Sequence, residues 1–542
     1  MASISEIISN PWTGSTVMLV AVAMVFTLGR YLMSADQLPL PPGPKGLPLL
    51  GNINDLPCPG VVESYHWAKH KDLYGPISSV TVLGQTMVII NDAKIAFDLL
   101  RDRSAIHSSR PHQVFAGDLV GFKNITAMHR YDDTWKNQRK NITKVASSKA
   151  SIAEFDKIGE VEAARFLFNL LRAPDRLNDH IRHEAGTVIF KVTYGYQTRS
   201  GGNDPLVDLA GQAMEYFADA TVPGKWHVDI LPFLQYLPDW FPGNKFKRTA
   251  RDYAAVVDKC RELPYAFTQR QMKEKRHKLS YVSQAIEASA ADLYMDHVNK
   301  WSAFALCLGG ADTTVSAFMS FFLAMMVYPE VQKKAQQEIE QVIGRDRLPM
   351  VTDFPKLTYI EAIMKETHRW HPVAPMGIPH CSVKEDVYEG YRIPKGALLL
   401  YNAWQYTHDP ETYPEPDEFR PERHLTTPDH VAEPDPRNYI FGFGRRICPG
   451  RGVADNSLFI TMAQTLAVFD IEKPLDADGK VIEPEIQYEA GAVSHPLPYK
   501  ISIKPRSEHH EKLIRSLEGM YPLEESHVEE LEHVKWSNSR PK

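Results

Sequence analysis

The chain has 542 residues, of which 43% are hydrophobic, 24% charged and 10% aromatic, values close to the averages for globular proteins. This composition excludes a disordered chain, a collagen-like repeat and a small disulfide-stabilised scaffold. The net charge is −6, from 61 basic and 67 acidic residues, so no nucleic-acid partner is expected. The five cysteines are odd in number and far apart, which favours a reducing compartment.

The first predicted element is a membrane-spanning helix. Residues 7–29 carry no charge, and at 1.5 Å per residue they span about 35 Å, enough for a bilayer core of about 30 Å. A cleaved secretory signal is the alternative, but Glu6 and no basic residue precedes the run. Because Arg30 and Lys45 follow it, the positive-inside rule predicts a single-pass protein with a cytosolic body. We therefore expect an uncleaved anchor over residues 1–33.

A proline-rich segment, residues 34–46, follows the anchor. Four prolines lie between Pro39 and Pro44, which excludes a helix and favours a stiff, extended segment. We interpret it as a spacer that fixes how the body sits on the membrane. A proline-rich ligand for a partner domain is the alternative.

The body, residues 47–506, is expected to be mainly α-helical with a small β region. Residues 77–90 alternate around Gly84, which predicts a β-hairpin. Helical patterns dominate between residues 146 and 294 and are interrupted at Pro174, at Pro205 and across 223–242, a segment rich in aromatic residues. Those residues would dip into the membrane, cover a pocket or pack in the core. A long apolar helix follows, and its usual interpretation is a buried core helix.

Strand patterns return at 392–401 and at 501–503 before a charged tail begins. The tail, residues 507–542, contains eight Glu and five Lys or Arg, and its apolar positions are scattered. We therefore interpret the tail as a solvated, acidic extension.

A Trp–Arg pair occurs in the segment WKNQR, residues 135–139. Trp135 and Arg139 are four residues apart, so they share one face of a helix. Both side chains can donate hydrogen bonds to a carboxylate. The pattern is unspecific alone, and a surface pair is the alternative.

The long apolar helix contains the segment GGADTT, residues 309–314. Two glycines cost a helix about 2 kcal/mol relative to alanine, and an aspartate is unusual in an apolar helix. These residues suit a helix that passes over a metal-bound ligand. Small residues leave room for that ligand, and a hydroxyl or carboxylate group can pass protons to it. A small-residue packing face is the alternative.

An acid–base pair follows in the segment ETHR, residues 366–369. Glu366 and Arg369 are three residues apart and share a helical face. On a protein surface such a pair contributes only about a few tenths of a kcal/mol.

The most specific pattern is the loop FGFGRRICPG, residues 441–450. A thiolate that binds a metal must be held rigidly, with backbone N–H groups directed at its sulfur. The glycines let the backbone turn tightly and approach a flat cofactor, Arg446 offers a cation to an anionic group, and Phe441 can cover the sulfur of Cys448. A glycine-rich turn around a buried structural cysteine is the alternative.

This loop resembles the haem-binding loop of the cytochrome P450 family, F-x-x-G-x-R-x-C-x-G, and all five fixed positions match. The resemblance implies that Cys448 is the axial iron ligand, whose electron donation favours O–O cleavage. The segment GGADTT is similar to the family's oxygen-activating motif. By that resemblance Thr313 orients protons toward dioxygen, and Asp312 connects the proton path to solvent.

The family's other motifs are matched as well. Its structural E-x-x-R pair is completed by an arginine before the haem loop, which corresponds to Arg423. His424 departs from the pattern, because an aromatic residue usually follows that arginine. The resemblance implies that four residues hold the haem propionates, with Arg110 as a further candidate: Trp135, Arg139, His380 and Arg446.

The resemblance covers about residues 10–506, and it is to the fungal, microsomal type. The chain is similar to secondary-metabolite oxygenases of filamentous fungi, such as enzymes like O-methylsterigmatocystin oxidoreductase. The resemblance implies one large helix-rich domain that binds haem b and sits on the endoplasmic-reticulum membrane with its catalytic domain in the cytosol. Electrons would come from NADPH through NADPH–cytochrome P450 reductase, with cytochrome b5 as a further partner. One oxygen atom from O2 would enter a small lipophilic substrate, in secondary metabolism or xenobiotic oxidation.

Pocket walls are assigned only by analogy with family positions. They are Val114, Phe115, Ala305, residues 373–378 and residues 491–493, which are mostly apolar and favour a hydrophobic substrate. Two alternatives remain: a haem-thiolate enzyme that uses peroxide or rearranges its substrate, and a non-catalytic haem-binding protein.

Overall fold

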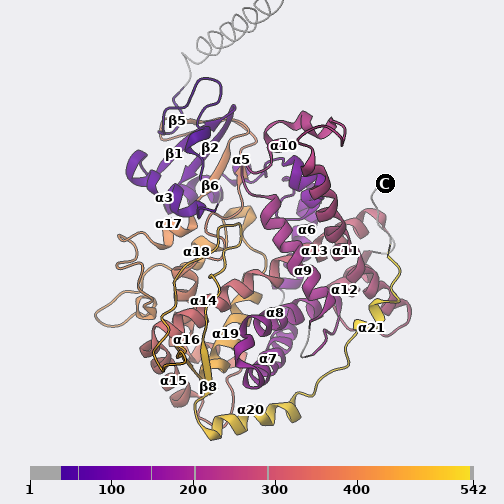
Figure 1. Cartoon of the computed structure of the whole chain (residues 1–542), viewed down its shortest axis with the longest axis vertical. Helices are drawn as coiled ribbons and strands as arrows, with labels where there is room; N and C mark the ends of the chain where they lie inside the picture. Colours follow the sequence, from indigo (N-terminus) through magenta and orange to yellow (C-terminus); the bar gives the residue numbers. More distant parts are fainter. Residues whose placement is uncertain (1–37, 59, 148, 201–202, 290–291, 537–542) are drawn as a thin grey trace, which may run out of the picture.

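The computed structural model describes residues 38–58, 60–147, 149–200, 203–289 and 292–536. The expected anchor, residues 1–33, lies outside these described residues. The described chain is mainly helical with a small β region, as expected. Figure 1 shows the main sheet at one end and helices over the rest of the body.

The longer helices are α3 (Glu63–Tyr74), α6 (Asp133–Ser147), α7 (Lys149–Arg172), α8 (Leu177–Tyr194), α9 (Pro205–Ala220), α11 (Lys245–Lys273), α12 (Tyr281–Ser289), α13 (Leu293–Ala311), α14 (Thr313–Val327), α15 (Pro329–Val342), α16 (Thr358–Trp370), α19 (Arg451–Val468) and α20 (Glu508–Met520). The short α-helices are α4 (Ala93–Ala96), α5 (Ser104–His107), α10 (His227–Ile230), α17 (Ala403–Thr407), α18 (Arg437–Ile440) and α21 (Val528–Leu531). The strands are β1 (Ile77–Val82), β2 (Gln85–Ile90), β3 (His380–Cys381), β4 (Asp386–Tyr388), β5 (Tyr391–Ile393), β6 (Leu398–Tyr401), β7 (Phe469–Glu472) and β8 (Ser502–Pro505).

The largest sheet has the strand order β1–β2–β6–β3. β1 and β2 form the predicted hairpin, which turns through Leu83 and Gly84 with φ values of 48° and 88°, as a two-residue hairpin turn requires. β6 runs parallel to β2 and antiparallel to β3, where His380 lies opposite Leu399. The sheet thereby places His380, a predicted site residue, at the edge opposite the hairpin, with β6 between them.

The two remaining strand predictions have different outcomes. The region 392–401 is two strands, β5 and β6, because the Ala397 N–H donates to the carbonyl of Pro394 (3.0 Å) and closes a turn between them. Near 501–503 the structure has the predicted strand, β8, which pairs antiparallel with β7.

The predicted core helix is buried but interrupted. Within the described residues, the stretch Leu293–Val327 is the one that is long and apolar enough to cross a membrane, and 72% of its most apolar window is buried inside the protein. The helix breaks at Asp312, with φ −123° and ψ −36°, into α13 and α14. α14 packs in a cluster with α7, α16 and α19, and α13 in a cluster with α8, α9 and α11.

The aromatic segment 223–242 is partly packed and partly exposed. The Trp226 ring stacks on Phe115 with 3.6 Å between ring centroids, so this end covers the body. Tyr236 and Trp240 are each 81% exposed. In Figure 1, α10 and the main sheet lie at the same end of the molecule.

The C-terminal tail is not the solvated extension that its composition indicates. Residues 507–536, here called the C-terminal strap, run along the helical body (Figure 1) and form α20 and α21. Ile514 and Leu517 of α20 are buried in the cluster around α7, and Leu531 and Val534 in the cluster around α11. The charged composition hides these apolar contacts, which depend on helices far away in the sequence.

Glu524 is the electrostatic centre of the C-terminal strap. Its carboxylate lies 2.7 Å from Lys191 Nζ and 2.5 Å from Lys278 Nζ. Partial burial alone would raise the pKa of Glu524, but the two lysines lower it to about 2. Nearby, the Gln197 N–H donates to Nδ1 of His527 (2.9 Å). The strap therefore joins α8 to the segment that follows α11.

Glu524→Gln should lower the free energy of unfolding by about 1 kcal/mol, because it removes the carboxylate that pairs with Lys278 and leaves Lys191 paired with Glu162 alone. Hydrogen exchange should rise around Gln197. Glu525→Gln removes an adjacent exposed carboxylate and should change neither quantity. Thermal unfolding and hydrogen exchange of both variants check this, and equal effects of the two substitutions would refute it.

Candidate active site

The glycine-rich loop before α19 holds Cys448. The Cys448 N–H donates to the carbonyl of Phe441 (2.7 Å), and Gly444 has a φ of 53°. A Cβ on Gly444 would lie 2.5 Å from the carbonyl oxygen of Leu100, so this approach requires glycine. The loop conformation therefore follows from its sequence.

The Cys448 side chain is surrounded by protein but exposed on one side. Burial raises the pKa of the thiol, while the Gly450 backbone and the Arg139 guanidinium act in the opposite direction. Because α19 begins at Arg451, the positive end of its dipole also favours a thiolate. A thiol placed in this way is suited to bind a metal ion from its exposed side.

Two buried arginines near this loop have no carboxylate partner among the described residues. Arg446 donates to the carbonyls of Ser108 and His129, both at 2.7 Å. Arg110 donates to three carbonyl oxygens at 2.6–2.8 Å. Burial lowers the pKa of Arg110 to about 10, and burial with repulsion from Arg110 and Arg139 lowers that of Arg446 to about 8.

Arg139 adds a further positive charge to this group, and His380 adds a basic side chain that is neutral in these surroundings. Burial lowers the pKa of Arg139. The His380 Nδ1–H donates to the carbonyl of His107 (2.7 Å). Burial, and then the charge of Arg110, holds the pKa of His380 well below its ordinary value. Arg110, Arg139, His380 and Arg446 are here called the cation cluster.

The cation cluster and the thiol together fit haem b. Buried positive charges without a counter-charge destabilise a protein, and a ligand with two carboxylates would neutralise them. Haem b carries two propionate carboxylates and an iron that accepts a thiolate. The residues present therefore suit this cofactor, with Cys448 as the iron ligand and the cation cluster as the partner of the propionates.

Trp135 contacts Arg446 and holds its guanidinium in place. Its Nε1–H donates to the carbonyl of Thr126 (3.2 Å), which also accepts a hydrogen bond from Arg446 (3.1 Å). The Arg446 guanidinium lies 4.3 Å from the centre of the indole ring, a cation–π distance. In this arrangement Trp135 positions Arg446, and its own contact with a propionate stays a prediction.

The two glycines of α13 have different environments. A Cβ on Gly309 would meet no atom within 4 Å, whereas a Cβ on Gly310 would lie 2.7 Å from Cδ1 of Ile189 in α8. Gly309 thus leaves open space beside the helix, and Gly310 permits close packing of α13 against α8. The sequence predicted the first role for both residues, and the structure supports it for Gly309.

Asp312 and Thr313 lie at the break between α13 and α14. The Thr313 hydroxyl donates to the carbonyl of Gly309 (2.6 Å). The Asp312 carboxylate accepts a hydrogen bond from Nε2 of His495 (3.2 Å) and lies 3.8 Å from Arg182, whose side chain is 41% exposed. Asp312 is therefore in contact with a residue at the protein surface. His495 and Arg182 carried no signal in the sequence.

The E-x-x-R pair is completely buried. Arg369 donates to both carboxylate oxygens of Glu366 at 2.8 and 2.9 Å, and Arg423 donates to one of them at 3.1 Å. Nε2 of His424 donates to the same carboxylate (2.9 Å). His424, a departure from the family pattern, is thus a fourth member of the network. Burial alone would raise the pKa of Glu366, but Arg369 and His424 lower it to about 2.

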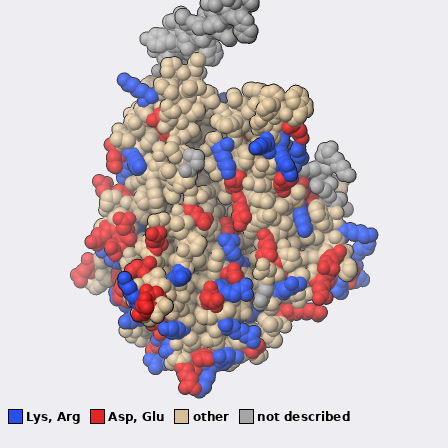
Figure 2. All heavy atoms as spheres, in the orientation of Figure 1, with Lys and Arg blue, Asp and Glu red and all other residues tan. Residues whose placement is uncertain are grey.

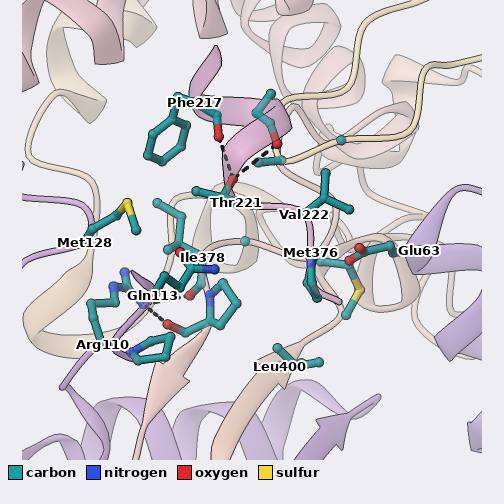
Figure 3. Close-up of a pocket in the computed structure, with 17 residues that line it drawn as sticks. Glu63, Arg110, Gln113, Met128, Phe217, Thr221, Val222, Met376, Ile378 and Leu400 are labelled. Atoms are coloured by element: carbon teal, nitrogen blue, oxygen red, sulfur yellow. Dashed lines mark hydrogen bonds between the residues drawn. The ribbon is translucent and has the colours of Figure 1, made fainter. Parts of the chain in front are cut away.

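A pocket opens beside the cation cluster (Figure 3). Its empty volume is about 750 Å³, including open solvent at its mouth. Of the expected walls, residues 376–378 and 491–492 line it, whereas Val114, Phe115 and Ala305 do not. Pro223, which also lines the pocket, begins the aromatic segment 223–242, for which covering a pocket was one of the predicted roles. The end of α9, the following Val222 and Glu63 of α3 were not predicted, because no motif marks them.

Comparison with known proteins agrees with these features. The family model described as Cytochrome P450 matches residues 41–503. Cytochrome P450 monooxygenase claR of Ampulloclitocybe clavipes is 44% identical over 500 residues, 92% of each chain. Cytochrome P450 monooxygenase ppsD of Aspergillus oryzae is 42% identical over 529 residues, 96% of this chain and 100% of the relative. O-methylsterigmatocystin oxidoreductase of Aspergillus flavus is 38% identical over 486 residues, 89% of this chain and 91% of the relative. The resemblance inferred from the motifs is confirmed.

Proposed function

The chain belongs to the cytochrome P450 family of haem-thiolate monooxygenases, and we propose that it inserts one oxygen atom from O2 into a small lipophilic substrate in fungal secondary metabolism or xenobiotic oxidation. NADPH supplies the electrons through a reductase. The observation that carries this proposal is the exposed Cys448 thiol beside a buried cation cluster that has no carboxylate partner among the described residues.

Each group of residues then has its own part. Haem, when bound, supplies the iron at which dioxygen is reduced, and a thiolate ligand favours cleavage of the O–O bond. Cys448 provides that thiolate, and the cation cluster holds the propionates. Gly309 keeps the side of α13 open. The apolar walls of the pocket bind the substrate and exclude water from it.

Protons would reach the reaction through the break in the helix. The Thr313 hydroxyl, whose acceptor is the Gly309 carbonyl, can rotate to pass a proton. Asp312 contacts His495 and the partly exposed Arg182, so it can take up protons from the surface side. The intact Asp312–Thr313 pair supports O2 as the oxidant over the peroxide-using or rearranging alternatives.

Thr313→Ala should uncouple electron use from product formation. Alanine is a good helix former, so folding and haem content should stay nearly unchanged. Without the hydroxyl, product formed per NADPH should fall at least about tenfold while hydrogen peroxide rises. Thr314→Ala is the control, because Thr314 lies about 100° further round the helix. Measured coupling that stays at the wild-type level in Thr313→Ala, or falls more in Thr314→Ala, would contradict the role of Thr313.

A basic surface beside the Cys448 loop supports the reductase as partner, with cytochrome b5 as a second donor. Lys136, Lys140 and Lys144 recur every four residues along α6 and are exposed, so they form one stripe. Lys136 and the exposed Arg445 both lie over the Tyr131 ring, at 5.5 and 5.0 Å, which joins the stripe to the loop. A local basic patch of this kind attracts an acidic protein partner.

Charge reversal on this stripe should weaken the binding of the reductase to this chain. Lys140→Glu combined with Lys144→Glu should raise the reductase concentration needed for half-maximal turnover about tenfold at low salt, and the difference should shrink as salt screens the charges. Lys480→Glu changes an exposed lysine on the loop between β7 and β8 and serves as control. Steady-state titration with reductase checks this. Equal sensitivity of the control would contradict it.

Exposed apolar residues indicate which end of the molecule faces the membrane. Tyr236 and Trp240 of the aromatic segment are exposed, as are Leu47, Leu49 and Leu50 near the start of the body. Figure 2 shows few charged side chains at the end where α10 and the main sheet lie. This supports docking of that end on the endoplasmic-reticulum membrane, with residues 1–33 as a single-pass anchor, 34–46 as a spacer and a cytosolic catalytic domain over 47–506. Of the tail, residues 507–542, the described part 507–536 packs on that domain.

One experiment tests the proposed reaction. The haem-loaded chain is combined with NADPH and reductase under isotope-labelled dioxygen, and lipophilic candidates are screened by mass spectrometry. We expect one labelled oxygen atom in the product and none without NADPH. Product formation from peroxide alone, an unlabelled rearranged product, or no turnover of any candidate would favour the peroxide-using, rearranging or non-catalytic alternatives.

A further inference from the structure

The pocket contains two polar side chains that have no partner among the described residues. Of its four polar side chains, Thr221 donates to the carbonyls of Phe217 and Ala218 at 2.8 and 3.3 Å, and Arg110 belongs to the cation cluster. The side chains of Glu63 and Gln113 make no hydrogen bond or ion pair within the described part of the chain. These two side chains are therefore available to a ligand.

Of these two side chains, Glu63 has the more clearly defined position and surroundings. It is the first residue of α3, and its carboxyl group points into the pocket toward Val222 and Met376 (Figure 3). Burial in this apolar wall raises the pKa of Glu63 to about 7. An unpaired carboxyl group in such surroundings costs free energy. A ligand that completes its hydrogen bonds would recover this cost.

The position of Glu63 also makes the two ends of the pocket chemically different. In Figure 3, Arg110 of the cation cluster lies on one side of the pocket and Glu63 on the opposite side. Between them lie Ile378 and Met376, and Met128 lies on the same side as Arg110; none of these side chains carries a charge. A substrate that spans the pocket therefore meets apolar side chains along its length and a carboxyl group at its far end.

We propose that Glu63 is a specificity residue that binds the hydroxyl group of a lipophilic substrate, whose apolar remainder extends toward the cation cluster. This inference rests on the proposed function. A hydroxyl group loses less free energy on leaving water than an ammonium group does, and it bonds to either protonation state of the carboxyl group. Oxygen would then be inserted at a carbon remote from the substrate's hydroxyl group.

Calorimetric titration of the haem-loaded full chain tests this at neutral pH. The probes are octan-1-ol and its isomer heptyl methyl ether, which has no O–H group. We expect the wild type to bind the alcohol about five- to tenfold more tightly than the ether. Glu63→Leu should bind the two isomers equally, and Glu63→Gln, which keeps a hydrogen-bonding amide, should retain part of the preference.

Asp72→Leu is the matched control, because it removes an exposed carboxylate from the same helix and should keep the wild-type preference. Equal binding of the isomers by the wild type, a full preference in Glu63→Leu, or tighter binding of octyltrimethylammonium than of octan-1-ol would each overturn the proposal. The carbon monoxide spectrum of the same reduced samples reports haem-thiolate ligation separately. A haem ligand other than thiolate would change that spectrum, and a failure of the proposed function would abolish NADPH-dependent incorporation of labelled oxygen. A failure of this inference would leave both intact.

Discussion

Cys448→Ser should lower NADPH-dependent turnover at least about a hundredfold. A serine hydroxyl stays protonated at neutral pH and does not give the electron donation that a thiolate supplies for O–O cleavage. The neighbouring cation cluster is unchanged by the substitution, so some haem should still be bound. The measurement is product formed per haem, so that loss of cofactor and loss of chemistry are separated.

The control for this prediction is another free cysteine. Cys58 is exposed and far from the loop in sequence, so Cys58→Ser should keep wild-type turnover. Turnover per haem that survives in Cys448→Ser, or that falls equally in Cys58→Ser, would remove Cys448 from the role assigned to it.

Glu366→Gln should lower the free energy of unfolding by about 3–5 kcal/mol, because it removes the carboxylate that pairs with the buried Arg369 and leaves the buried Arg423 paired with Glu433 alone. Glu330→Gln, on the exposed face of α15, should change stability by less than about 0.5 kcal/mol. Denaturant unfolding of the haem-loaded proteins measures both values. Similar losses in the two variants would show that the network carries no special share of stability.

The effect of Glu366 should also depend on pH. Its pKa is lowered from 4.5 to about 2 in the folded protein, so the unfolded chain binds the proton more readily. The stability that its charge contributes is therefore fully present above about pH 4.5 and is lost as pH falls toward 2. The difference in unfolding free energy between the wild type and Glu366→Gln should stay constant above pH 5 and shrink below it.

His424→Phe tests how much the His424 side chain contributes to the stability of this network. Phenylalanine removes one of the hydrogen bonds to Glu366 but keeps both arginines, so we expect a smaller loss than in Glu366→Gln. The sequence marked His424 only as a departure from a pattern. Its contact with Glu366 depends on the fold that brings residues 366 and 424 together, which the local sequence does not encode.

Features with a local cause were predictable from the sequence. The hairpin over residues 77–90 follows from side-chain alternation around one glycine, and the loop at Cys448 follows from glycines that its backbone requires. The core helix was predicted from its apolar length. Its break at Asp312 was not, because the contacts of Asp312 come from Arg182 and from His495, which are distant in the sequence.

Features that depend on distant partners were missed or misread. The tail was interpreted as solvated because glutamates dominate its composition. One signal was present, since Leu513, Ile514 and Leu517 share a face of α20. The cluster that buries Leu531 and Val534, however, is formed by α8, α9 and α11–α13. Glu63 carried no motif at all. Its role arises only because α3 and the end of α9 meet at one pocket.

The carbon monoxide complex of the reduced, haem-loaded chain tests the central claim most directly, because its absorption reports the atom that binds the iron. The wild type should show the strongly red-shifted band that is characteristic of thiolate ligation, and Cys448→Ser should lose it. A wild-type band at the position found for histidine-ligated haem proteins, or a red-shifted band that persists in Cys448→Ser, would contradict the assignment of Cys448 as the iron ligand.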